Sequence, residues 1–142
     1  MNAPLYNRAI LALAVALADF PRLASPTRTG ALRAPLCGSR VVLDLTIAAD
    51  GSVARVGLSV EACALGQAAA ALLARAAPGR SPAALVTAHQ TLAAWLAGEA
   101  GDQPDWPGIG VLAPARAYPA RHAAILLPFA LAAQLTSEPA PA

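Results

Sequence analysis

The chain carries two cysteines, and their positions indicate where its chemistry lies. Cys37 comes just before a strand-like run, and Cys63 comes where a helix-like run begins. A thiolate is a nucleophile and a soft metal ligand, and the unpaired N–H groups and dipole of a helix N-terminus stabilise negative charge. The sequence therefore predicts that Cys63 reacts or binds metal, with Cys37 as the second candidate.

The segment between the two cysteines is predicted to form an antiparallel β-hairpin. Apolar residues alternate with others over residues 41–48, which is typical of a strand with one buried face. Asp50-Gly51 is a strong turn signal, and the alternation resumes over residues 53–60. The chain then leaves the hairpin at Cys63.

Helical periodicity and stop signals predict three further helices, at residues 64–77, 81–98 and 121–135. Pro128 either kinks the last of these or begins a new first turn. Residues 22–36 and 98–118 lack a sustained period, so both are expected to be loops, and residues 137–142 are expected to be a frayed tail. The order of elements predicts an α+β fold, in which helices pack on one side of a small antiparallel sheet, as a single domain over residues 1–136.

An apolar stretch at residues 9–18 follows Arg8 and has two interpretations. It is too short to span a bilayer, which takes about 20 residues. It resembles a short signal-peptide core, which would mean export, but a single arginine makes a weak charged region, so a buried first helix is preferred. If this stretch is a buried helix and not a signal peptide, a cytoplasmic location is expected.

Composition and motifs exclude several classes of function. The chain of 142 residues is 57% hydrophobic, and its net charge of +2 is too small and scattered for a nucleic-acid surface. The sequence has no glycine-rich phosphate loop, no Gly-x-Ser-x-Gly elbow and no histidine pair at helix spacing for zinc. We therefore expect neither an enzyme of these classes nor a membrane or nucleic-acid partner, and the cysteines remain the chemical candidates.

Three segments occur in an order and spacing that one family shares: Cys37-Gly38-Ser39-Arg40, Glu61-Ala62-Cys63-Ala64-Leu65-Gly66-Gln67-Ala68 and Tyr118-Pro119-Ala120-Arg121-His122-Ala123-Ala124-Ile125-Leu126-Leu127. With an opening helix around residues 5–11, they resemble the NifU N-terminal, IscU and SufU family of iron-sulfur cluster assembly scaffolds. The first is similar to the family's Cys-Gly-Asp, and the second to its Gly-Cys-x-x-x-x-Ala at a helix start. The third resembles the SufU-branch Phe-Pro-Ala-Arg-x-x-Cys-Ala-x-Leu, and the long loop before it favours that branch.

The resemblance implies that three cysteines and one aspartate meet at one end of the domain and hold zinc or a nascent iron-sulfur cluster. This chain departs from the pattern twice. Ser39 stands where the family has aspartate, and the third cysteine is replaced by Ala124, or by Ala123 if His122 matches the histidine before that cysteine in the IscU type. Cys37 and Cys63 remain as ligands of a cluster or metal ion, with His122 as a third metal ligand and Ser39 as a weak one.

Three functions fit these residues. The first is a scaffold-like protein that accepts sulfur on Cys63 and binds iron, zinc or a nascent 2Fe–2S cluster, with a cysteine desulfurase and acceptor apo-proteins as implied partners. Two chains could share a cluster through two thiolates each, which predicts a homodimer on metal loading. The second is a degenerate relative that binds no metal and docks on the desulfurase as an interaction module. The third is a thiol protein in which Cys37 and Cys63 form a reversible disulfide.

Overall fold

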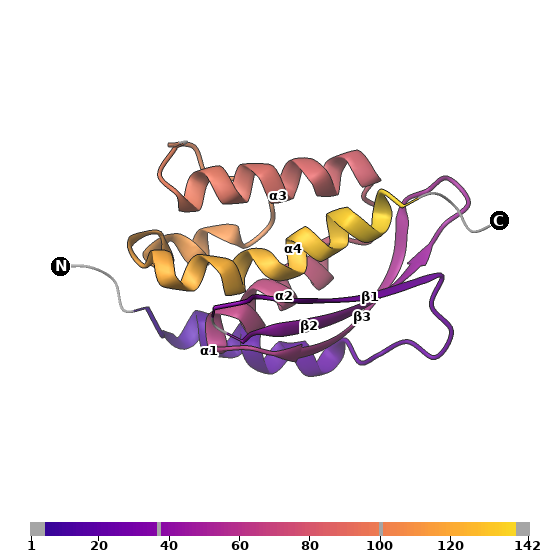
Figure 1. The fold of residues 1–142 in the computed structure, drawn as a ribbon, viewed down its shortest axis with the longest axis horizontal. Helices are drawn as coiled ribbons and strands as arrows, with labels where there is room; N and C mark the ends of the chain where they lie inside the picture. The colour runs from indigo at the N-terminus through magenta and orange to yellow at the C-terminus, as the bar shows by residue number, and fades with distance from the viewer. Residues whose placement is uncertain (1–4, 37, 100, 139–142) are drawn as a thin grey trace.

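The computed structural model describes residues 5–36, 38–99 and 101–138, which form an α+β fold (Figure 1). Its elements, with η marking 3₁₀ helices, are α1 (Arg8–Ala16), η1 (Leu17–Asp19), β1 (Arg28–Arg33), β2 (Arg40–Ile47), β3 (Val53–Glu61), α2 (Ala64–Ala76), α3 (Pro82–Leu96), η2 (Ile109–Ala117), η3 (Pro119–Arg121) and α4 (His122–Thr136). The predicted fold class is confirmed, and the helices predicted after the hairpin are present as α2, α3 and α4.

The sheet consists of three antiparallel strands in the order β1-β2-β3. β2 and β3 form the predicted hairpin, and the turn between them follows from its residues. Gly51 has a φ of 89°, a left-handed conformation that glycine adopts without strain. Asp50 Oδ1 accepts hydrogen bonds from the backbone N and the Oγ of Ser52, at 2.9 and 2.6 Å. The hairpin therefore returns the chain to the end of the sheet where Cys63 follows.

The prediction of a loop over residues 22–36 is wrong, because β1 pairs with β2 at the edge of the sheet. Its side chains are alternately half-buried and exposed, so its sequence lacks an apolar face. A Cβ on Gly30 would lie 2.8 Å from Leu135 Cδ2, so α4 packs closely against this strand at the glycine. β1 is ordered by its neighbours and not by its own strand propensity, which sequence periodicity does not detect.

The predicted loop at residues 98–118 contains a regular element, η2. It buries Ile109, Leu112 and Ala115, which are three residues apart. This spacing matches the three residues per turn of a 3₁₀ helix, so one stripe of η2 faces the core even though Pro114 lies inside it. The segment therefore shows neither an α-helix nor a strand period, because its buried positions recur every three residues.

Trp106 anchors the part of this segment that precedes η2. Its Nε1 donates a hydrogen bond to the carbonyl of Leu72 on α2 at 2.9 Å, and its side chain is buried. The ring meets Phe129 of α4 edge-on, with 5.3 Å between ring centroids. The indole thus joins the segment to two helices and has its polar atom satisfied.

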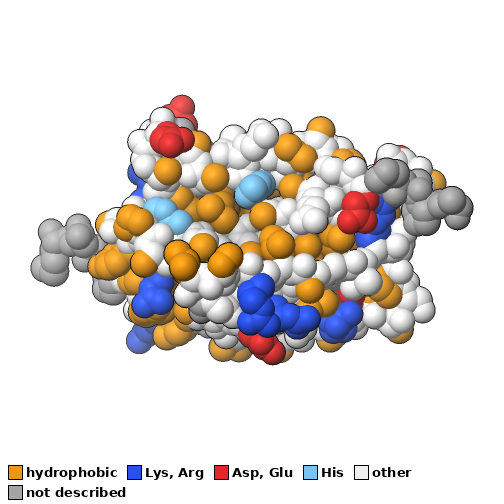
Figure 2. All heavy atoms as spheres, in the orientation of Figure 1, with side chains coloured by type: hydrophobic (Ala, Val, Ile, Leu, Met, Phe, Trp, Pro, Cys, Tyr) orange, Lys and Arg blue, Asp and Glu red, His pale blue; other side chains and the backbone are white. Residues whose placement is uncertain are grey.

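Helices α2 and α4 pack against one face of the sheet, and α3 lies on the outer side of α4 (Figure 1). The apolar stretch near the N-terminus forms α1, as preferred from the sequence, and it packs along α2 with Ile10 and Leu13 buried. α4 continues through a buried Pro128. In the face shown in Figure 2, hydrophobic side chains spread across the helical side and arginines gather along the sheet side.

The segment before β1 crosses the other face of the sheet and is held there by Asp44 of β2, whose side chain has no exposed surface. The carboxylate accepts hydrogen bonds from Arg22 Nε at 2.6 Å, Arg22 Nη2 at 3.1 Å, Thr29 Oγ1 at 2.7 Å and Leu23 N at 3.0 Å. Burial by itself would raise the pKa of Asp44, but the hydrogen bonds from Arg22, Thr29 and Leu23 outweigh burial and lower it. Asp44 is therefore an internal tie between the sheet and the chain that covers it.

We expect Asp44→Asn to lower the free energy of unfolding by about 2 to 4 kcal/mol at neutral pH, because it removes the buried carboxylate that accepts hydrogen bonds from Arg22, Thr29 and Leu23. The folded pKa of Asp44 lies below its unfolded value. The contribution is therefore complete above about pH 4 and is lost as the pH falls through the folded pKa.

Urea unfolding across the acid range measures both effects. The exposed Asp19→Asn is the matched control, with an expected change within about 0.5 kcal/mol. An Asp44→Asn protein as stable as the unmodified chain at neutral pH would contradict the role of this tie.

Candidate functional site

Cys63 lies at the junction between β3 and α2, where it is the N-cap residue of the helix. Its backbone is extended, with φ −63° and ψ 169°, and its side chain makes no capping hydrogen bond. Gln67 closes the junction, because its Nε2 donates to the carbonyl of Ala62 at 3.0 Å and its backbone N to that of Cys63 at 3.0 Å. The thiol is free and half-buried at the N-terminus of a 13-residue helix.

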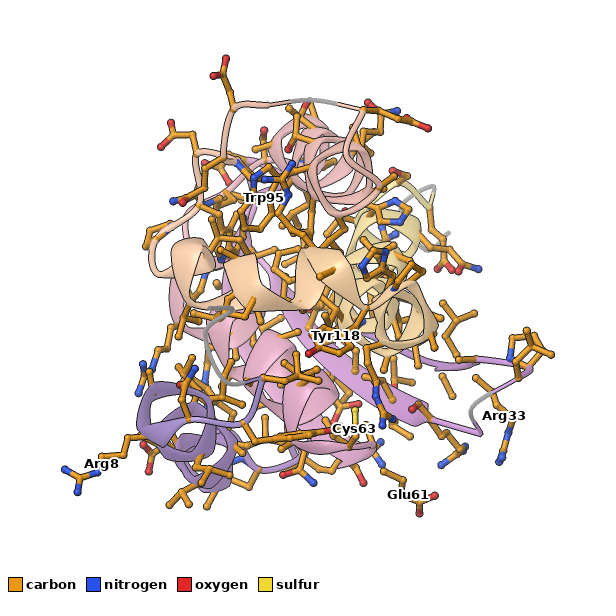
Figure 3. All side chains as sticks on the ribbon, turned by 90° about the vertical axis from the view of Figure 1, so that its left-hand side faces the viewer. Arg8, Arg33, Glu61, Cys63, Trp95 and Tyr118 are labelled. Carbon is orange, nitrogen blue, oxygen red and sulfur yellow. The ribbon has the colours of Figure 1, made fainter. Side chains whose placement is uncertain are left out.

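A pocket of about 180 Å³ lies beside this thiol. Three separate parts of the chain supply its walls, namely the turn before β2, the β3–α2 junction and the start of α4, with lining residues Gly38, Ser39, Glu61, Ala62, Cys63, Ala120, Arg121 and Ala124. Figure 3 shows Cys63 at this end of the molecule, with Glu61 extending outward on one side of it and Tyr118 on the other. The three segments singled out in the sequence therefore meet in one place.

The two positions at which this chain departs from the family pattern both line the pocket. Ser39 is 5% exposed, and its carbonyl accepts a hydrogen bond from Ala34 N at 2.8 Å, which closes the turn before β2. Ala124 is 3% exposed, whereas the neighbouring Ala123 is exposed and is not one of the lining residues. Of the two alignments considered for the third cysteine, the one that uses Ala124 places that position beside Cys63.

Close packing between α2 and α4 brings Ala124 to Cys63. A Cβ on Gly66 would lie 2.7 Å from Ala62 Cβ, 3.3 Å from the carbonyl oxygen of Ala124 and 3.4 Å from its Cβ. Glycine in the first turn of α2 therefore permits the approach of the two helices that forms one wall of the pocket.

His122 lies outside this group of residues. Its Nε2 is 2.9 Å from the carbonyl of Ala115 in η2, and since a carbonyl only accepts, Nε2 carries the proton and Nδ1 is the remaining nitrogen for a metal ion. The ring is half-buried against η2 and does not line the pocket beside Cys63. The predicted ligand role of His122 therefore stays a prediction that this contact does not favour.

Cys37, the other predicted ligand, lies outside the described residues. Within the ranges that the structure describes, no group of three or more His, Cys, Asp and Glu side chains is placed to hold a metal ion. Glu61 and Arg121 are lining residues that sequence reasoning left out of the site. Their positions in the sequence could have indicated them, because each lies within three residues of a predicted site residue.

Comparison with solved structures identifies the family. The N-terminal part of a nitrogen-fixing NifU-like protein from Brucella abortus is 32% identical to this chain, covers 92% of it and 91% of its own length, and superposes with a TM-score of 0.83. This chain belongs to the NifU-like N-terminal family. The resemblance recognised from the three segments is thereby confirmed.

Two further solved structures share the fold of this NifU-like chain. A candidate iron-sulfur cluster assembly scaffold protein for the SUF system, from the thermophile Fervidobacterium islandicum, superposes with a TM-score of 0.85 at 16% identity, over 94% of this chain and 97% of that one. A hypothetical protein superposes with a TM-score of 0.74 at 17% identity, over 94% and 100%. At these identities the likeness shows the fold alone. No protein-family model and no curated protein matches the chain.

No helix in the described part of the NifU-like chain is long and apolar enough to cross a membrane.

We expect Gly66→Ala to destabilise the protein by about 1 to 3 kcal/mol, because the added methyl group would lie 2.7 Å from Ala62 Cβ and would also press against Ala124 at the start of α4. In a helix without such packing, the same change would stabilise by about 1 kcal/mol, so the sign of the effect tests the contact. Thermal unfolding measures it, with Gly101→Ala as the control, since a Cβ there meets open space. An increase in stability for Gly66→Ala would contradict the close approach.

Proposed function

We propose that this NifU-like domain takes part in iron-sulfur cluster assembly as a scaffold-like protein and is not itself an enzyme. One observation carries the proposal: the free thiol of Cys63 shares a pocket with Ser39 and Ala124, the positions that match ligands in the family pattern. The family membership and the likeness to a candidate SUF-system scaffold support the same role. By that role, a cysteine desulfurase would supply sulfur, acceptor apo-proteins would receive the product, and the cytoplasm would be the site of action.

The proposed cargo is iron, zinc or a nascent 2Fe–2S cluster, with Cys63 as its first ligand. Cys37 is the proposed second ligand, because it precedes Gly38, a lining residue, in the sequence and matches a cysteine of the family pattern. Two thiolates leave two positions of a tetrahedral site unfilled, since Ser39 offers a neutral hydroxyl and Ala124 offers no donor. A second copy of the chain, a partner protein or water would complete the site, and such an incomplete ligand set suits transfer better than storage.

Sulfur delivery would use the same thiol. The Cys63 thiolate attacks the outer sulfur of a persulfide on the desulfurase, a new S–S bond forms at Cys63, and the desulfurase sulfur leaves as a thiolate. The position of Cys63 at the N-terminus of α2 supports this step, because the helix stabilises the attacking thiolate.

We expect Ala124→Cys to increase the iron that the protein retains after anaerobic loading with ferrous iron and sulfide, because it adds a third thiolate to the wall of the pocket. Iron and sulfide analysis after gel filtration, with the visible absorption spectrum and the molar mass of the eluting species, measures the effect. The unmodified chain should gain a chromophore in a dimer that Cys63→Ala abolishes.

Ala123→Cys is the matched control, because Ala123 is exposed on the same turn of α4 and is not a lining residue. Gain with Ala124→Cys and none with Ala123→Cys supports the pocket as the metal site. His122→Ala tests the remaining predicted ligand in the same assay. Absence of metal and colour in both the unmodified chain and Ala124→Cys would contradict the scaffold proposal.

The alanine and serine at two ligand positions also favour a second candidate, an interaction module that docks on a cysteine desulfurase without holding metal. This candidate predicts that a variant with alanine at both Cys37 and Cys63 still binds the desulfurase in a pull-down or calorimetric titration. Loss of binding with the fold intact would show that the thiols are required and would contradict it. Thiol titration with and without oxidant tests the further alternative, a reversible disulfide between the cysteines.

A further inference from the structure

A second cavity lies far from Cys63, at the other end of α2. It has a volume of about 350 Å³ and lies between α3 and the segment that contains Trp106. Arg80, which follows the C-terminus of α2, forms part of its wall. Because α2 has 13 residues at about 1.5 Å each, roughly 20 Å of helix separates this cavity from the thiol, so it does not belong to the pocket described above.

Arg80 presents a fixed positive charge to the cavity. Its Nε donates to the carbonyl of Ala76 at 2.9 Å, and its guanidinium lies over the Trp106 ring, 4.3 Å from the ring centroid. The ion pairs found among the described residues involve Arg22 and Arg28, so no described carboxylate neutralises this cation. The stacking and the backbone contact hold the guanidinium in place before any ligand arrives.

The N-terminus of α3 adds to the positive end of this cavity. Ala83 and Ala84, in the first turn of α3, line it next to Arg80. The 15-residue helix directs its positive dipole end toward this side, which favours a carboxylate or another anion. A guanidinium and a helix N-terminus thus meet at one wall.

Asp105 supplies the opposite charge to the same cavity. Its side chain is exposed, and it forms no ion pair with Arg80 or with any other described residue. Ala88 and Trp106 give the cavity an apolar floor, and Thr87 contributes a hydroxyl. The cavity is therefore lined by two charges of opposite sign that form no ion pair with each other, together with a small apolar surface.

We propose that this cavity binds a small zwitterion, an amino acid or dipeptide, with its carboxylate at Arg80 and its ammonium group at Asp105. Its volume lies at the small end of the range of about 300 to 1,000 Å³ for ligand pockets. An anion alone would pair with Arg80 and make no use of Asp105, a cation alone would pair with Asp105 and make no use of Arg80, and an apolar ligand would pair with neither. A ligand that carries both charges can form an ion pair with each of the two residues.

The test titrates the full chain with L-alanine, L-valine and L-alanyl-L-alanine, and with propionate and propylamine as analogues that carry one charge each. Calorimetry and amide chemical shifts at Ala84, Thr87 and the Trp106 indole report binding. We expect saturable binding of a zwitterion that is at least about tenfold tighter than that of either analogue, because each analogue leaves one charge unpaired. The comparison of alanine with the dipeptide identifies which of the two zwitterions the cavity takes.

Asp105→Asn should weaken zwitterion binding about tenfold and leave propionate binding unchanged, whereas Arg80→Gln should weaken both. Asp102→Asn and Arg75→Gln are matched controls, because neither residue lines this cavity. Equal losses in Asp105→Asn and Asp102→Asn, propionate binding as tight as alanine, or no saturable binding by any of the three zwitterions would overturn the proposal. Iron loading through Cys63 should be unaffected by these variants, so failure here is distinct from failure of the scaffold role.

Discussion

The pocket beside Cys63 depends on how closely α2 can approach α4. The contact at Gly66 sets this distance, because any side chain there would meet Ala62 and the backbone of Ala124. The same approach buries Leu65 and Ala68 and holds the thiol, the turn before β2 and the start of α4 in one group. The site is thus a product of helix packing, because Leu65, Gly66 and Ala68, which contribute no chemistry of their own, bring its walls together.

Alanine carries much of this packing. An alanine side chain buries little surface, yet α2 is buried on nearly all sides, with alanine at positions 68 to 71 fully enclosed. Small side chains allow α1, α4 and the sheet to approach α2 closely. The helix is therefore held by many van der Waals contacts between small groups and not by a few large side chains. Larger buried side chains, Trp106 and Phe129 among them, fill the space that alanine leaves.

The sequence was sufficient to predict the structure in those segments where local periodicity and turn chemistry agree. The β2–β3 hairpin, the start of α2 at Cys63 and the meeting of Ser39 with Ala124 beside it could all be predicted, because alternation, an Asp-Gly turn and the family-like segments each indicate them. β1 could not be predicted, since its order comes from pairing with β2 and from the contact of Gly30 with α4. η2 could not be predicted either, because its buried residues recur every three positions and match neither an α-helix nor a strand. The hydrogen bond from His122 to the carbonyl of Ala115 could not be predicted, because it depends on where η2 lies.

Cys63 occupies a position where most proteins place a serine, threonine, aspartate or asparagine, whose oxygen would bond an amide of the first turn. Here that amide receives no side-chain partner from Cys63, and the foregone stabilisation is typically about 1 kcal/mol. A better capping residue would strengthen the helix and remove the sulfur. The start of α2 therefore lacks the stabilisation of a capping side chain and carries a free thiol in its place, while the close packing around Gly66 supports this end of the helix.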